Sequence, residues 1–533
     1  MEVKPQEIKK LLKNNLVILI GLLLLTFLLF YKTLQFSFIA DDFALTGSSK
    51  LGFGTYGIYW GHPASVIEFF LIYKLFGANI FAFNIFGILL RALTGFVSFL
   101  FISKLTNSKS LGIILSILLI TSYVGLQSTT WASAQVAQID LILVTLTSYL
   151  YLIYLNSKKL TNFIIFSIVF LLSLVSDIGR NFPLVVIIFY LFICDLLRSK
   201  TKNSFKMGEL KGIGLLFSVS FILFIIWYIF FGYFFGGFIT HHHTRIPFDT
   251  FKYFFGSLAN LFLDPLLRTF EFSADNQNQF EQLYIFFGVL SVSLWVFVTY
   301  RFIKLKSNIF YFLSVLLFWM FIFYLPSWFS YPRIYVPATH RYLTAAGFGF
   351  IAIIALIIFE VYKKNKQLGS ILFIVVLLVN LITLNFHINQ ENSFRSTSIA
   401  SRVWTSINKE VPKNEKDSMF YLKGNQPLLT WGLVWSSGAP LKILRGEEAS
   451  TLHSIEITEN IEKIANYLCL NGITSLPKLK EREAVIPFHA WYVFPNGVTK
   501  NITVSELVTL ENLYKTYSCV DLRKKYGSHF NYW

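Results

Sequence analysis

The sequence is poor in charged residues, which make up 14% of its 533 positions, whereas soluble domains carry roughly a quarter. This composition excludes a fully soluble globular protein, because too few charges remain to cover a water-exposed surface. Hydrophobic residues reach 55%. They are concentrated in blocks of roughly 17 to 25 residues, the length that a helix needs to cross about 30 Å of hydrocarbon. The chain is therefore predicted to be an integral membrane protein in a lipid bilayer.

Acidic residues are scarce as well, since 29 Asp and Glu stand against 46 Lys and Arg, which gives a formal net charge of +17. The basic residues lie mainly in short loops between apolar blocks, so the excess of positive charge indicates membrane topology and not a nucleic-acid partner.

The sequence has three cysteines, without a zinc-type spacing. Cys469 and Cys519 fall in the polar C-terminal part, where a disulfide and two free thiols both fit the sequence.

The apolar blocks predict eleven transmembrane helices. Their spans are about 16–38, 79–103, 111–127, 136–157, 160–177, 181–197, 211–235, 282–303, 308–326, 341–362 and 368–387. With the N-terminus in the cytoplasm, every short basic loop lies on the cytoplasmic side of the plasma (inner) membrane, as the positive-inside rule requires. The odd number of crossings then makes the C-terminal domain extracytoplasmic.

Two outer segments are apolar but too short or too interrupted to cross the membrane. Residues 64–76 contain Glu68 and Lys74, and residues 251–270 are broken by an Asp-Pro pair. Both are predicted to be surface or re-entrant helices, and the first could instead be half of a kinked second span.

Polar residues return after position 388. Strand-like runs at residues 419–422 and 490–494 alternate there with a helix-like run at 461–470. The expected fold is therefore an all-α polytopic membrane bundle over residues 1–388, followed by a small α/β domain over residues 389–533.

Asp41 and Asp42 are adjacent where the first predicted helix leaves the membrane on the outer side. The partial negative charge of a helix C-terminus and the repulsion between two carboxylates both oppose this placement, so a cation or a cationic ligand group is expected nearby. One carboxylate could accept a proton from a hydroxyl group while the other binds a metal or a sugar. A solvated pair of loop acids explains the residues equally simply.

Several basic residues are candidates for binding a phosphate group. Arg180 precedes the sixth predicted helix, and His340 and Arg341 precede the tenth, where free backbone N–H groups and guanidinium groups suit an anion. These arginines could also anchor the helix ends in the lipid headgroup region. Arg91 lies near the middle of the second predicted span, where an isolated charge is costly and indicates a functional residue.

Asp177 and Trp131 could contact a sugar at the outer face, although Trp131 also suits the aromatic belt of a membrane protein.

Several segments, taken in order, resemble the GT-C class of polyprenyl-phosphate-dependent glycosyltransferases, and most closely the branch of protein O-mannosyltransferases and their multi-spanning bacterial relatives. The similar segments are the pair Asp41-Asp42, His62-Pro63, Leu75-Phe76-Gly77 with Phe83, Trp131, the stretch from Leu171 to Asp195, and Arg341-Tyr342-Leu343 with Gly347 and Phe348.

The sequence also departs from the family pattern. His62 stands where arginine is usual, Gly87 and Arg91 replace an asparagine and a histidine, and Val175, Ser176 and Asp177 replace a Ser-Lys-Glu segment.

The resemblance implies inverting transfer of a sugar, with mannose as one candidate, from a polyprenyl-phosphate donor to a hydroxyl of a protein, glycan or lipid acceptor. Asp42, or else Asp41, would be the general base. Arg341 and Arg180, with His340, would bind the donor phosphate. His62, Arg91, Trp131 and Asp177 would contact substrate.

The acidic pair would also suit a divalent metal such as Mg or Mn, although no cofactor is required by the resemblance. Two other classes remain open. One is a transporter or a flippase for lipid-linked glycans, and the other is a non-catalytic assembly subunit.

Overall fold

The computed structural model describes eleven parts of the chain. They are residues 5–39, 41–56, 60–198, 207–231, 251–267, 281–330, 336–412, 417–424, 453–458, 461–470 and 487–526. The contacts divide the chain into two compact units. Unit 1 comprises residues 1–31, 58–67 and 84–387, and unit 2 comprises residues 32–57, 68–83 and 388–533. Two stretches of the predicted membrane region, 32–57 and 68–83, therefore pack with the C-terminal part.

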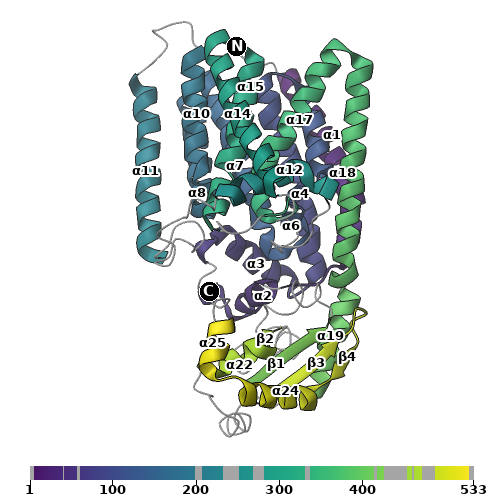
Figure 1. The fold of residues 1–533 in the computed structure, drawn as a ribbon. Helices are drawn as coiled ribbons and strands as arrows, with labels where there is room; N and C mark the ends of the chain where they lie inside the picture. Colours follow the sequence, from purple (N-terminus) through teal and green to yellow (C-terminus); the bar gives the residue numbers. More distant parts are fainter. Residues whose placement is uncertain are drawn as a thin grey trace. The chain divides into compact units, whose positions relative to one another are not determined.

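Unit 1 is built from helices (Figure 1). The longer ones are α1 (Pro5–Phe30), α4 (Ile80–Thr106), α5 (Lys109–Thr121), α7 (Val136–Ser157), α8 (Leu160–Ser176), α10 (Pro183–Arg198), α11 (Met207–Phe231), α12 (Phe251–Leu267), α14 (Glu281–Leu305), α15 (Asn308–Ile322), α17 (Thr344–Lys364) and α18 (Lys366–Arg395). Short turns connect them at α6 (Gln127–Thr130), η4 (Ala132–Ala134), α9 (Ile178–Asn181), α16 (Leu325–Ser330) and η6 (Arg341–Leu343). The first four residues of α4 and the last eight of α18 belong to unit 2.

Seven helical segments in the described ranges are long and apolar enough to cross a membrane. They are Asn15–Gln35, Ile80–Thr106, Ala132–Ser157, Gly179–Leu197, Ile285–Leu305, Arg341–Lys364 and Lys366–Ser393. Four shorter apolar helices, Lys109–Thr121, Leu160–Ser176, Gly212–Trp227 and Asn308–Ile322, fall on the other four predicted spans. The membrane class of the protein thus agrees with the sequence prediction. The last residues of two predictions, 232–235 and 268–270, lie outside the described residues.

The helices of unit 1 bury one set of apolar side chains and expose another. Leu115, Val315 and Ala355 are fully buried where α17 packs against α5 and α15. Leu28 on α1 and Ile229 on α11, by contrast, are about 70% exposed. Apolar side chains outside as well as inside are what a helix bundle in lipid requires, because the bilayer replaces water as the solvent.

The start of α17 lies against the loop between α5 and α6. Gly125 in that loop has a φ of 66°, and a side chain there would collide with Thr344. A Cβ atom at Gly347 would likewise collide with Val124. The backbone N–H groups of Gly125 and Gln127 donate to the carbonyl oxygens of Ala338 and Thr339 at 2.8 and 2.9 Å. The loop and the segment before η6 are therefore held together as one piece.

Unit 2 contains α2 (Asp41–Leu51), part of α3 (Pro63–Phe76) and an α/β domain. Its other elements are η1 (Tyr31–Gln35), η2 (Phe53–Thr55), α19 (Thr397–Glu410), β1 (Asp417–Gly424), β2 (His453–Thr458), α22 (Ile461–Leu470), β3 (Phe488–Val493), β4 (Thr499–Asn501), α24 (Thr503–Thr516) and α25 (Cys519–Tyr526). The predicted strands and the predicted helix at 461–470 are all present.

The four strands form a sheet in the order β2-β1-β3-β4, in which β1 is parallel to β2 and β3, and β4 is antiparallel to β3 (Figure 1). Side chains alternate between the faces of a strand. Ala490 packs with Leu468 of α22 and Leu510 of α24 on one face. The neighbouring Trp491 points to the other face, where its Nε1 donates to Glu410 of α19 at 2.8 Å. Helices thus cover both faces of the sheet.

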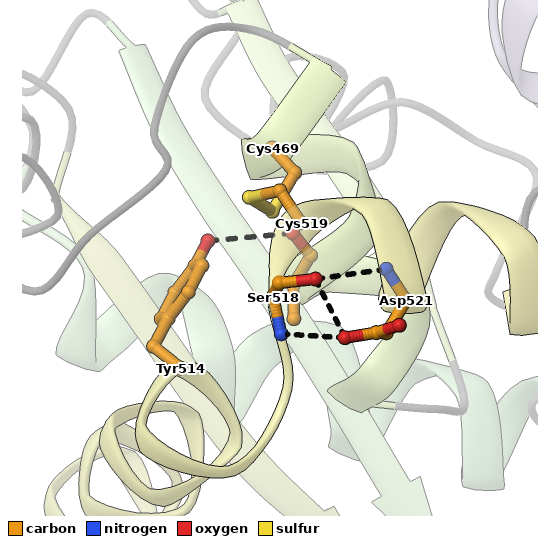
Figure 2. The surroundings of a disulfide bond; sticks show 6 residues. Cys469, Tyr514, Ser518, Cys519 and Asp521 are labelled. Atoms are coloured by element: carbon orange, nitrogen blue, oxygen red, sulfur yellow. Dashed lines mark hydrogen bonds between the residues drawn. A yellow bond between two sulfur atoms is a disulfide. The ribbon is translucent and has the colours of Figure 1, made fainter.

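Cys469 and Cys519 form a disulfide that joins α22 to α25 (Figure 2). Ser518 sits at the start of α25, where its Oγ accepts from the Asp521 N–H at 3.2 Å and its own backbone N–H donates to the Asp521 carboxylate at 3.2 Å. This reciprocal capping satisfies backbone donors that a helix N-terminus otherwise leaves open. Nearby, the Tyr514 hydroxyl donates to the Ala465 carbonyl at 3.3 Å. The disulfide is one of the two outcomes that the sequence left open.

Cys519→Ser is expected to destabilise the α/β domain by about 4 kcal/mol, because the bridge spans 50 residues and restricts the unfolded chain over that whole loop. Pulse proteolysis of the full chain in increasing urea, with cleavage of this domain as the readout, measures the loss of stability. Cys194→Ala, which removes the buried thiol of α10 that takes no part in the disulfide, is the matched control. An unchanged urea midpoint in Cys519→Ser would contradict the expectation.

Candidate functional site

The predicted residues His62 and Asp177 meet in unit 1, although 115 positions separate them in the chain. His62 Nδ1 lies 2.7 Å from Asp177 Oδ2. Arg180 Nε approaches the same carboxylate oxygen at 3.3 Å, and the Arg180 backbone N–H donates to Asp177 Oδ1 at 3.0 Å. The imidazole and the guanidinium group therefore converge on one carboxylate. Burial by itself raises the pKa of Asp177, but the charges of His62 and Arg180 outweigh it and hold that pKa below its usual value.

This geometry follows from a break between two helices. α8 ends at Ser176 and α9 spans only Ile178–Asn181 before α10 begins, so Asp177 occupies the corner with its carboxylate 1% exposed. Behind it, the buried Asp140 of α7 accepts from Ser176 Oγ at 3.0 Å and from Asn181 Nδ2 at 2.8 Å. These bonds fix the corner and therefore the direction in which Arg180 points.

Arg341 and Trp131, two further predicted residues, stack on each other. The guanidinium carbon of Arg341 lies 4.3 Å from the centroid of the Trp131 ring and 5.2 Å from that of Tyr342. Arg180 lies over the same Tyr342 ring at 5.5 Å. Two guanidinium groups thus share one aromatic side chain. Cation–π contacts stabilise an arginine without neutralising it, and the Arg180 guanidinium group is in addition paired with Asp177.

Several polar atoms around these arginines are buried and have no hydrogen-bond partner within the part of the chain that the structure describes. They are Arg180 Nη1, Trp131 Nε1, Gln127 Oε1 and Asp140 Oδ2. Leaving a buried donor unsatisfied costs roughly 1–3 kcal/mol. Two of these atoms, Arg180 Nη1 and Trp131 Nε1, are donors and suit an oxygen-rich group, whereas Gln127 Oε1 and Asp140 Oδ2 are acceptors.

His340 has a different environment from the one that its position suggested. Its Nδ1 accepts the Tyr342 backbone N–H at 3.2 Å, which caps the turn η6. Burial lowers the pKa of His340 well below its usual value, and the charges of Arg341 and Arg180 lower it further. A neutral imidazole can orient Tyr342 and Arg341 but adds no positive charge for a phosphate.

Arg91 is fully buried, and its guanidinium group faces backbone carbonyls. Nη2 donates to Leu119 at 2.7 Å and to Ser122 at 2.6 Å, and Nη1 reaches Val124 at 3.4 Å. Carbonyls at a helix C-terminus lack intrahelical donors and carry partial negative charge. Arg91 therefore caps α5 and holds the loop that leads to Trp131, so these contacts give its buried charge a structural explanation.

The acidic pair of unit 2 occupies the start of a helix and not the end of one, which corrects the electrostatic argument from the sequence. The first helix ends at Phe30, and Asp41 and Asp42 form the first turn of α2. Asp42 is fully buried, and its Oδ2 accepts the Ile39 N–H at 3.0 Å. A helix N-terminus favours carboxylates, so the helix dipole creates no need for a cation at this pair.

Glu68 of α3 is an additional buried acid in unit 2. It is 4% exposed, and neither carboxylate oxygen has a hydrogen-bond partner among the described residues. Burial raises its pKa well above the usual value, and the charge of Asp42 raises it further. The sequence contained a signal for this residue, because Glu68 interrupts an otherwise apolar run.

Glu68→Gln is expected to raise Tm at pH 8 and to change it less at pH 5. Because the folded pKa lies above the unfolded value of about 4.3, stability from this group is present at low pH and is lost as pH rises. Glutamine has nearly the same shape but no charge. Melting curves of both proteins between pH 5 and pH 8 measure the difference, with Glu360→Gln as the control. A Tm difference that stays constant with pH would disprove the assignment.

A divalent metal at the acidic pair would need further ligands. No group of three or more His, Cys, Asp or Glu side chains that could hold a metal ion occurs in the described ranges. Two acids, one of which already accepts a backbone N–H, do not form a metal site by themselves.

Asp140 is the clearest residue that the sequence reasoning missed. It lies inside the predicted span 136–157, and an acid inside a transmembrane span is by itself a sign of function.

In comparisons with known proteins, no family model and no curated sequence matches this chain.

Proposed function

We propose that the chain is a membrane glycosyltransferase that transfers a sugar from a polyprenyl-phosphate donor to a hydroxyl of a protein, glycan or lipid acceptor. The observation that carries this proposal is the cluster of Arg341, Arg180, Trp131 and Tyr342, in which two guanidinium groups stack on aromatic rings beside unsatisfied buried donors. Such a cluster suits a phosphate group that gains charge when its bond to a sugar breaks.

In this proposal the roles follow from the chemistry of inverting transfer. The acceptor oxygen forms a bond to the anomeric carbon while the bond from that carbon to the phosphate oxygen breaks, and the electron pair leaves with the polyprenyl phosphate. Arg341 and Arg180 stabilise that leaving group. Asp42 accepts the proton of the acceptor hydroxyl, with Asp41 as the alternative, on the ground of the sequence resemblance.

The proposed topology has eleven crossings, the seven long apolar helices and the four shorter ones together. Short helices can cross where their ends are packed within protein. The N-terminus is then cytoplasmic and the α/β domain extracytoplasmic. The Cys469–Cys519 disulfide supports this orientation, because such bonds persist mainly in oxidising compartments. Mannose remains one candidate for the sugar.

The test is to incubate the purified full chain in lipid with a set of radiolabelled polyprenyl-phosphate sugars and to measure free polyprenyl phosphate, with and without a chelator. Release with one sugar would support the proposal, identify the donor and decide metal dependence. Folded protein that binds these lipids but releases nothing from any of them would favour a flippase or an assembly subunit.

A further inference from the structure

The pair formed by His62 and Asp177 places a titratable group beside the arginines of the proposed phosphate site. Because His62 and Arg180 approach the same oxygen of Asp177, their side chains are neighbours. The carboxylate is 1% exposed, whereas His62 is 27% exposed. His62 is thus the more accessible member of the pair, and its Nδ1 is engaged by Asp177.

The hydrogen bond to Asp177 determines which nitrogen of His62 is free. The Arg180 guanidinium group, the Arg180 backbone N–H and the His62 ring keep Asp177 ionised. Its Oδ2 therefore acts only as an acceptor, and Nδ1 of His62 carries the proton of their hydrogen bond. In the neutral imidazole, Nε2 then has a lone pair and repels an anion. In the imidazolium ion, Nε2 becomes a second donor with a full charge.

We propose that protonated His62 donates from Nε2 to the donor phosphate, so that the bundle binds a phosphodiester more tightly at low pH than at high pH. This inference rests on the proposed function, and it adds a pH dependence that two arginines alone would not produce. The lone Nη1 donor of Arg180, buried and unsatisfied, marks the place where the anion would sit.

The charged and titratable groups that face His62 limit which of them can cause phosphodiester affinity to change with pH. Asp177 and Arg180 contact it directly. Asp140 lies behind Asp177 across Ser176 and Asn181, while Arg341 and His340 contact the Tyr342 ring that Arg180 also covers. Arginine does not titrate between pH 5.5 and pH 8.5. The lowered pKa of His340 keeps its imidazole neutral. Glu68, farther along α3, is the remaining group that a control must test.

The experiment measures binding of farnesyl methyl phosphate to the full chain in detergent between pH 5.5 and pH 8.5. This probe is a phosphodiester with one constant negative charge over that range, so any pH dependence belongs to the protein. His62→Asn keeps an N–H donor to Asp177 at the place of Nδ1 but has no Nε2. His62→Arg supplies a permanent charge. The controls are Glu68→Gln and His489→Asn, the latter at a histidine on β3 of unit 2.

The wild type should bind the probe about tenfold more tightly at pH 5.5 than at pH 8.5, the effect of one charge-assisted hydrogen bond. His62→Asn should bind weakly at every pH, His62→Arg tightly at every pH, and both controls should keep the wild-type slope. If the pH dependence of binding were retained in His62→Asn, or lost in Glu68→Gln, the role of His62 would be disproved and the proposed function would be unaffected. Folded wild type that binds no probe at any pH would instead refute the phosphate site, and with it the proposed function.

Discussion

Replacing Arg341 by Gln is expected to lower the turnover of sugar transfer by about 10² to 10³-fold, the usual cost of removing one preorganised donor to developing charge. The phosphate oxygen gains negative charge as the glycosidic bond breaks, and Arg341 meets it from a fixed position on Trp131. The loss should therefore appear mainly in kcat. Release of polyprenyl phosphate under saturating donor is the measurement.

Arg341→Lys separates the charge from the stacking. An ammonium group retains the positive charge but cannot lie flat on the indole ring or present two parallel donors, so its activity should lie between those of wild type and Arg341→Gln. Arg301→Gln is the matched control, because Arg301 also contacts aromatic rings, those of Phe297 and Phe310, without belonging to the cluster. Equal activity in Arg341→Gln and wild type would remove the basis of the proposed phosphate site.

Asp42→Asn is expected to reduce turnover by about 10² to 10⁴-fold, which is the range for loss of a general base. The substitution should leave the fold intact, since the asparagine carbonyl can still accept the Ile39 N–H that Asp42 Oδ2 accepts at 3.0 Å. Donor binding should be largely retained, because only the proton acceptor is removed. Single-turnover transfer together with donor binding distinguishes the two steps.

Asp41→Asn tests the alternative assignment. Asp41 is only half-buried in the same first turn of α2, and we expect it to cause the smaller loss. A larger loss in Asp41→Asn would exchange the two roles. Normal transfer by both variants would exclude the acidic pair as the base and would favour a binding or assembly function.

The sequence was sufficient to predict the membrane class, the positions of the apolar helices and the α/β character of the C-terminal part. These properties depend on local composition and periodicity, which each segment carries whatever its neighbours are. It also singled out Arg341, Arg180, Trp131, His62 and Asp177, because charged and aromatic residues near helix ends are conspicuous in a chain so poor in charge.

Which of these residues meet depends on the fold and could not be predicted from the sequence. His62 and Asp177 are far apart in sequence, and the carbonyl partners of Arg91 carry no mark of their own in the sequence. The position of Asp41 and Asp42 at a helix start depended on a break after Gln35 that apolar periodicity does not reveal. Burial and charge pairing arise from contacts between distant segments, so the electrostatics of Glu68, Asp177 and His340 became definable only once the chain had folded.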